Sequence, residues 1–284
     1  MRAYLSAAFI VALTLALSAP VVRAQGVADR AKVLRAAADA LGMGRWSDIG
    51  GANTRLPGID IINTMELQGS GTSDMGGRQV KTDFHIALGY NPVAARVEFT
   101  RTPDGGAAQH TIQTVRDTYA WNESEIGAGL VQGKGVATPA MTAVRERLLR
   151  IWMLPYGVVK AAYAAGDKTV VATEAGATTI TAPLSGQLAG ITLKATLDAS
   201  SLITKVEARA DNTALANLNL EAEYSGYADH AEVLTDVKTP GRLVLKQGGR
   251  TVADITVKTW ETNNPYLVFP VPANVKAAPA TTSR

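Results

Sequence analysis

Cysteine is absent from this chain of 284 residues. Disulfides are therefore excluded, and so are the thiolate-bound metal sites that stabilise many small domains. A chain of this length can nevertheless bury about 70–75% of the surface that its unfolded form exposes. We therefore expect the apolar core alone to hold the fold.

A charge excess of either sign is also missing. The chain carries 28 lysines and arginines against 25 aspartates and glutamates, a formal net charge of +3. Arg2 and Arg23 precede residue 25 and no acid does, so residues 25–284 carry a net charge of +1. Because a nucleic-acid-binding protein would show a basic stripe, we expect no nucleic acid among the partners.

Histidine is scarce, and its spacing favours neither a metal site nor catalysis. His85, His110 and His230 lie far apart, and none belongs to a His-x-His or His-x-x-x-His pair. We predict no catalytic residue, no metal ligand and no cofactor, and we expect His85 to be exposed on a polar strand face. An enzyme remains an alternative if dispersed histidines and carboxylates converge in space. The carboxylates concerned are Asp74, Asp83, Glu98 and Asp117.

One long apolar stretch stands at the start of the chain. Leu5–Ser18 is interrupted only by small and hydroxyl residues, Pro20 follows it, and Val22–Ala24 resembles a signal-peptidase site. The stretch is shorter than the ~20 residues that a membrane-spanning helix needs. We predict a signal peptide over residues 1–24, removed near Ala24, and a periplasmic or secreted protein. Gln25 stands where a lipid-anchored protein would need cysteine, so we expect no stable membrane anchor.

Helical periodicity follows this segment. Apolar residues recur at helical spacing from Val27 to Leu41, charged residues separate them, and Gly42 ends the pattern. The spacing predicts one amphipathic helix that lies on another element. Its expected apolar stripe is Val27, Ala31, Leu34, Ala38 and Leu41.

Alternation with a period of two then predicts β-strands with one dry face. Phe84 and Ile86 alternate with polar residues, as do Val97 and Phe99, and the pattern returns over residues 191–198 and 217–224. Short turn sequences separate these strands, which favours antiparallel neighbours. We predict a mainly β protein (β-rich α+β): an antiparallel half-barrel meander with an N-terminal helix and an inserted helical lid. The turns are Asn91-Pro92, Asp104-Gly105-Gly106, Gly166-Asp167, Ala175-Gly176 and residues 247–250.

The lid is expected around residues 139–165. Thr138 is positioned to cap a helix whose first residue is Pro139, Pro155 ends or kinks it, and residues 158–165 predict a second short helix. We expect residues 25–275 to form a single half-barrel domain and residues 276–284 to be a disordered tail. The first helix carries an apolar stripe made of Met141, Val144, Leu148, Ile151 and Trp152.

An apolar cavity between the lid and the dry sheet face is the predicted site. The expected ligand is an apolar small molecule, a lipid, an acyl chain or a lipidated protein. The alternative structural interpretation is ordinary packing of a core helix on a sheet, which produces the same stripe. The residues expected to form the cavity and lid are Phe84, Ile86, Val97, Phe99, Met141, Val144, Leu148, Ile151, Trp152 and Val158.

This order of elements resembles two families. It is similar to the periplasmic lipoprotein carriers of the outer-membrane lipoprotein-sorting type, which implies an incomplete barrel closed by a helical lid around an apolar cavity. Several stretches also resemble the non-catalytic N-terminal domain of exported metallo-β-lactamase-fold hydrolases. The His-x-His-x-Asp-His signature of the hydrolase itself is absent, so the resemblance implies no metal ligand and no hydrolase activity. The stretches are Leu67–Gly71, Tyr90–Arg101, Ala120–Asn122, Ile151–Ala162, Asn264–Tyr266 and Val271–Val275.

Two functions other than an apolar carrier remain open. The chain could be a non-catalytic interaction module with a filled interior, associated with an envelope protein or a separately encoded hydrolase. It could also be an enzyme that uses the dispersed carboxylates and histidines. We favour the binding protein and expect no catalysis.

Overall fold

A computed structural model describes residues 27–43, 46–47, 54–55, 62–211, 218–229 and 237–279. The predicted signal peptide, His230 and the last five residues of the expected tail lie outside the described residues. Lys276, where that tail was expected to begin, is the last residue of helix α4 (Ala273–Lys276).

Within the described residues, thirteen strands form one antiparallel sheet in the order β8-β7-β6-β5-β4-β3-β17-β16-β13-β12-β11-β10-β9. Two meanders are thus joined in the middle, where β3 pairs with the last strand of the chain, β17. The bounds are β3 Thr64–Met75, β4 Arg78–Tyr90, β5 Val93–Thr102, β6 Gln109–Arg116, β7 Tyr119–Glu123, β8 Ala137–Pro139, β9 Val170–Glu174, β10 Ala177–Pro183, β11 Ile191–Leu197, β12 Ile203–Ala210, β13 Leu220–Ser225, β16 Arg242–Gln247 and β17 Arg250–Thr262. Short pairs are β1 Trp46–Ser47 with β2 Thr54–Arg55, and β14 Ala228–Asp229 with β15 Lys238–Thr239.

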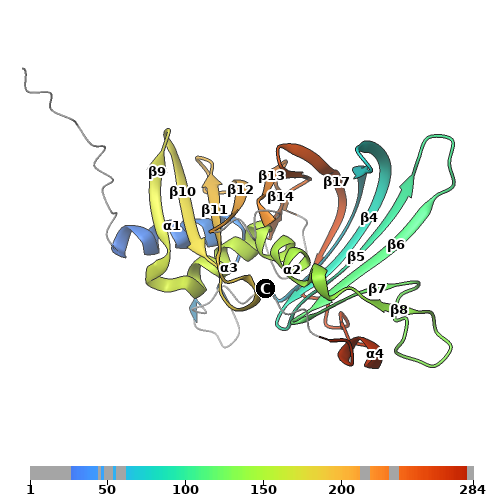
Figure 1. Cartoon of the computed structure of the whole chain (residues 1–284). Helices are drawn as coiled ribbons and strands as arrows, with labels where there is room; N and C mark the ends of the chain where they lie inside the picture. Colours follow the sequence, from blue (N-terminus) through green and yellow to red (C-terminus); the bar gives the residue numbers. More distant parts are fainter. Residues whose placement is uncertain are drawn as a thin grey trace, which may run out of the picture.

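The sheet is open because its two outer strands, β8 and β9, do not pair with each other. The chain joins them through residues 140–169, which hold 3₁₀ helix η1 (Met141–Ala143), helices α2 (Val144–Met153) and α3 (Pro155–Ala165), and η2 (Gly166–Lys168). A connection between the two free edges has to cross the mouth of a curved sheet. Figure 1 shows α2 and α3 lying between β9–β12 on the left and β4–β8 on the right. The predicted half-barrel meander with an inserted helical segment is confirmed.

The predicted turns and strand faces are present. The Asn91-Pro92 turn joins β4 to β5, and the residues expected on one face pair across these strands, Phe84 with Phe99 and Ile86 with Val97. The two phenylalanine rings meet edge to face, with centroids 5.6 Å apart. This register places the large apolar side chains of β4 and β5 together on the inner face.

The predicted start of the first inserted helix is wrong, and the second inserted helix is longer than expected. Thr138 and Pro139 do not cap a helix, because β8 pairs them with Asn122 and Trp121 of β7. An outer strand tolerates proline, since one side of its backbone is unpaired. Pro155 does more than end α2, because it is the first residue of α3.

Helix α1 (Val27–Ala40) follows most of its predicted stripe, since Leu34, Ala38 and Leu41 are buried. Ala31 is exposed, whereas Leu34, Ala37 and Ala38 are buried. This face packs on α3 and β9, so α1 extends the core at the β9 end of the sheet.

Candidate functional site

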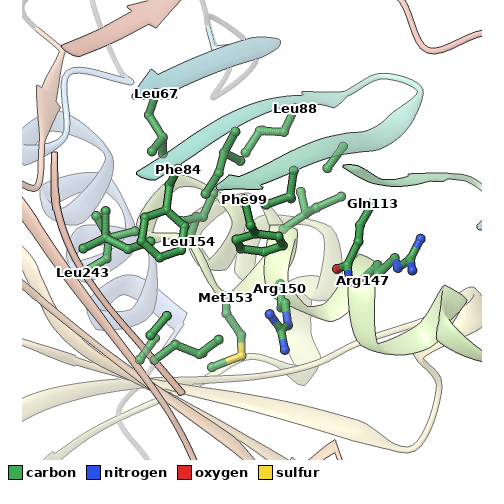
Figure 2. Close-up of a pocket in the computed structure, with 18 of the residues that line it drawn as sticks. Leu67, Phe84, Leu88, Phe99, Gln113, Arg147, Arg150, Met153, Leu154 and Leu243 are labelled. Carbon is green, nitrogen blue, oxygen red and sulfur yellow. The ribbon is translucent and has the colours of Figure 1, made fainter. Parts of the chain in front are cut away.

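An apolar cavity of about 120 Å³ lies between the end of α2 and the inner face of the sheet. Its walls come from β3–β6, α2 and its junction with α3, and strands β13, β16 and β17 (Figure 2). The lining residues are Leu67, Phe84, Ile86, Leu88, Ala95, Val97, Phe99, Gln113, Val115, Arg147, Arg150, Ile151, Met153, Leu154, Ala222, Tyr224, Leu243, Val244, Leu245, Ala253 and Ile255.

The helix junction is fixed above the sheet by one hydrogen bond and one close contact. The buried Tyr224 hydroxyl of β13 donates to the carbonyl oxygen of Met153 at 2.8 Å. Leu154 is extended between the two helices. A Cβ at Gly157 would lie 2.6 Å from the carbonyl oxygen of Ile151, so α3 approaches the end of α2 more closely than any larger residue allows. These contacts hold Met153 and Leu154 against the sheet.

The cavity follows a seam between two groups of buried apolar residues. Phe84, Phe99 and Ile255 form a small cluster of their own, separate from the main core that contains α1, α3 and most of α2. Half-buried Ile86 and Leu243 pack against both clusters. The inner face is therefore apolar at this position, but it is incompletely filled.

The structure brings half of the predicted site residues together. Phe84, Ile86, Val97, Phe99 and Ile151 line the cavity. Leu148 and Trp152 instead face a larger groove of about 570 Å³ between the helices and the β10–β11 connection. Val144 and Val158 are buried in the main core, and half-buried Met141 lies in η1. The apolar stripe of α2 is wide enough to face both the cavity and the larger groove. The sequence alone does not show which of its residues face which of the two.

Sequence reasoning missed lining residues of two kinds. Leu88, Ala95 and Tyr224 follow the same alternation as the predicted residues and could have been added on that signal. Arg147 and Arg150 gave no such signal, because charged residues beside an apolar stripe are normally assigned to solvent. Both line the cavity where α2 faces β5 and β6.

A polar hollow of about 230 Å³ adjoins the cavity. We call its charged residues, Arg101, Glu146, Arg147 and Arg150, the arginine rim. Arg101 lies with its Cζ 4.6 Å from the centroid of the Phe99 ring, and its Nε donates to Ser73 Oγ at 2.9 Å. The other residues of the hollow are Phe99, Gln113 and Ala143.

Arg147 attaches α2 to the sheet. Its Nη1 donates to the carbonyl oxygens of Thr114 at 2.9 Å and Trp121 at 2.7 Å, and its Nη2 donates to Asn122 Oδ1 at 2.7 Å. Burial lowers the pKa of the Arg147 guanidinium to about 10; Glu146 raises this pKa and Arg150 lowers it. Burial and the nearby Arg150 likewise lower the pKa of Arg101.

A polar cluster also lies on the outer face of β3–β5, where His85 was expected to be simply exposed. His85 lies with Nδ1 2.8 Å from Glu98 Oε1 and with Nε2 2.5 Å from Glu66 Oε1, so the expectation is wrong. His110 Nε2 lies 3.9 Å from Glu98 Oε2. Both ring nitrogens of His85 therefore lie within hydrogen-bond distance of a carboxylate on a neighbouring strand.

The dispersed carboxylates converge only in part. Asp83 and Glu98 share a surface hollow of about 260 Å³ with His85 and His110. Asp74 pairs with Arg250 and Asp117 with the adjacent Arg116, away from that hollow. Among the described residues, no group of three or more histidine, aspartate or glutamate side chains is arranged to hold a metal ion. None of the described helices is long and apolar enough to cross a membrane.

Comparison with known proteins finds solved structures that align with most of the chain. No protein-family model matches the chain, and no curated protein matches it. A domain described as an outer membrane lipoprotein-sorting protein domain from Vibrio parahaemolyticus is 7% identical, with a TM-score of 0.43. A LolA superfamily protein from Nitrosomonas europaea is also 7% identical, with a TM-score of 0.39, and each alignment covers 83% of this chain and 94% of the other.

Proposed function

We propose that the protein binds an apolar ligand, such as a lipid, an acyl chain or the chain of a lipidated partner, in the cavity between α2 and the sheet. The observation that carries this proposal is the lining, which is apolar except for Gln113 and the two arginines at one end. We propose binding without catalysis.

The size of the cavity requires movement on binding. Pockets for small ligands usually measure about 300–1,000 Å³, whereas this one measures about 120 Å³. An apolar chain enters when the end of α2 moves away from the sheet or when Phe84 and Phe99 rotate. Burial of apolar surface by the ligand contributes about 25 cal/mol per Å² to the free energy of binding. This contribution offsets the loss of the contacts between α2 and the sheet.

Titration with the neutral fluorescent probe N-phenyl-1-naphthylamine tests this proposal. We expect saturable binding, and we expect Ala253→Leu, which fills the cavity from β17, to raise the Kd at least about tenfold. Val252→Leu is the matched control, because Val252 is the adjacent residue and does not line the cavity. Fluorescence that does not saturate, or equal loss of affinity in both variants, would exclude this cavity as the site.

The small volume favours a second candidate, an interaction module whose interior stays packed. Its interaction surface would be the connection from β7 to β8, where four apolar side chains are exposed: Ile126, Leu130, Val131 and Val136. The partner would be an envelope protein or a separately encoded hydrolase. Absence of probe binding, together with a stable partner that is lost on Val131→Asp but not on Val170→Asp of β9, would favour this function.

We also propose that residues 1–24 direct export and are removed near Ala24. The apolar run and the small residues before Gln25 support this proposal. Mass spectrometry of the protein expressed with its full N-terminus should find Gln25 as the first residue. A mass that retains Met1 would contradict export by cleavage.

A further inference from the structure

The arginine rim carries more positive charge than its surroundings balance. Three guanidinium groups, those of Arg101, Arg147 and Arg150, face one hollow together with a single carboxylate, Glu146. The rim residues are partly exposed, and the Arg150 side chain is 37% exposed. A partly desolvated cation is nevertheless stabilised when an anion pairs with it.

The hydrogen-bond partners of the rim do not neutralise its excess positive charge. Within the described part of the chain, neither Arg101 nor Arg147 forms an ion pair with a carboxylate; their partners are a hydroxyl, two carbonyl oxygens and an amide. Arg150 Nη2 donates to Glu146 Oε1 at 2.6 Å, one turn away on α2. The buried Nε of Arg150 has no hydrogen-bond partner among the described residues.

The rim and the apolar cavity are continuous. Phe99, Gln113, Arg147 and Arg150 line both hollows, and the polar one adds about 230 Å³ of space at the end of the cavity. Figure 2 shows Arg150 beside Phe99 and Met153, and Arg147 beside Gln113. An apolar chain that filled the cavity would therefore place its head group among the arginines.

Building on the proposed apolar-ligand function, we propose that the arginine rim binds the anionic head group, a carboxylate or phosphate, of an amphiphile whose apolar chain occupies the cavity. Guanidinium groups suit this role because they donate two parallel hydrogen bonds to such oxygens and remain charged. The stacked Phe99 ring holds Arg101 at the point where the two hollows meet.

A pair of probes that differ only in the head group tests this inference. The carboxylate probe is 11-(dansylamino)undecanoic acid, and the neutral probe is its methyl ester. In the unaltered protein we expect the acid to bind about tenfold more tightly than the ester, as one or two charge-assisted hydrogen bonds would give. Arg150→Gln and, independently, Arg101→Gln should bring this ratio close to one, because each variant weakens binding of the acid more than binding of the ester.

Arg145→Gln is the matched control. Arg145 is on the same helix, outside the rim, and donates to the carbonyl oxygen of Ala189. The Arg145→Gln substitution removes one positive charge, as the rim substitutions do, and should leave the Kd values of the acid and the ester unchanged. Thermal unfolding of all three variants separates loss of binding from loss of fold.

The outcomes separate this inference from the proposed function. Binding of neither probe would refute the proposed apolar-ligand function as well. Equal binding of acid and ester to the unaltered protein would leave that function standing and overturn the head-group assignment. Equal displacement of the acid and the ester by millimolar inorganic phosphate would also overturn it, because phosphate would then act elsewhere than at the head group.

Discussion

The inner face of the sheet is filled on one side and incompletely filled on the other. On the packed side, strands β9–β12, the side chains of Ile180, Leu193, Val206 and Ala208 are 0% exposed. On the cavity side, strands β3–β6, β16 and β17, some inward-facing residues such as Leu243 are only half-buried, whereas others such as Leu67 are buried. The two sides belong to one continuous sheet, so the difference arises in what covers them.

The covering helices differ in composition. Helix α3 is buried over its first eight residues and includes Gly157, Ala161 and Ala162, which let it lie close to β10 and β12. Helix α2 carries Arg145, Glu146, Arg147 and Arg150, so less of its surface can face the sheet. An apolar, small-residue helix completes a core, whereas a charged amphipathic helix leaves a polar-edged gap.

Matched leucine truncations should give the largest difference between the two sides. Leu193→Ala on the packed side should lower the free energy of unfolding by about 3 kcal/mol, since the removed atoms leave a closed void. Leu243→Ala should cost about 1 kcal/mol, because that side chain is half-buried beside a cavity. Urea unfolding of both variants measures this, and equal losses would show that the cavity side is as tightly packed as the other.

The helix junction, which the two sides share, should be nearly as sensitive. Gly157→Ala places a Cβ 2.6 Å from the carbonyl oxygen of Ile151 and 2.8 Å from the Cα of Trp152. Backbone atoms cannot move aside as a flexible side chain can, so we expect the variant to lose about 2 kcal/mol of stability. An unchanged melting temperature would mean that the junction opens readily and that α2 moves without cost.

The sequence predicted the strand faces because alternation is local. The dry face of Phe84, Ile86, Val97 and Phe99 follows from spacing alone, and the register pairs those residues as this pattern requires. The pairing of β3 with β17 did not follow, because alternation does not specify a partner almost two hundred residues away.

The arginine rim was hidden for a related reason. Arg147 binds the carbonyl oxygens of Thr114 and Trp121, and only the folded sheet brings these groups to α2. The pairs that His85 forms with Glu66 and Glu98 likewise depend on the register of three strands. Polar sites that span several strands can be recognised only from the tertiary structure, whereas an apolar strand face can be recognised from the alternation of residues in the sequence.

Replacing alanine by leucine should have opposite effects on stability on the two sides of the sheet. Ala208→Leu inserts three carbon atoms into a filled core and should lower stability by about 1–2 kcal/mol. Ala253→Leu inserts them into the cavity and should raise stability by about 0.5 kcal/mol. Differential scanning calorimetry compares the two melting temperatures, and destabilisation by Ala253→Leu would indicate that the cavity is too small or too rigid to take a side chain.

The smallest effect on stability is expected on the outer face of the sheet. Solvent covers this face on both sides, so the two sides do not differ there in packing. A hydrogen bond from Lys205 Nζ to Glu221 Oε2, at 2.9 Å, holds the pKa of the Glu221 carboxyl below its usual range. This stabilisation is therefore complete above the pKa of about 4.3 in the unfolded chain and is lost as the pH falls through the folded-state pKa.

We expect Glu221→Gln to cost less than about 1 kcal/mol at pH 7, because the pair is partly solvent-exposed. It should also make the decrease in stability toward acid pH shallower. Glu261→Gln, at an exposed position on β17, is the control for the loss of one negative charge. Urea unfolding between pH 3 and 7 measures both slopes. If Glu221→Gln lowered the free energy of unfolding more than Leu243→Ala does, charges on the outer face would matter more for stability than packing on the cavity side.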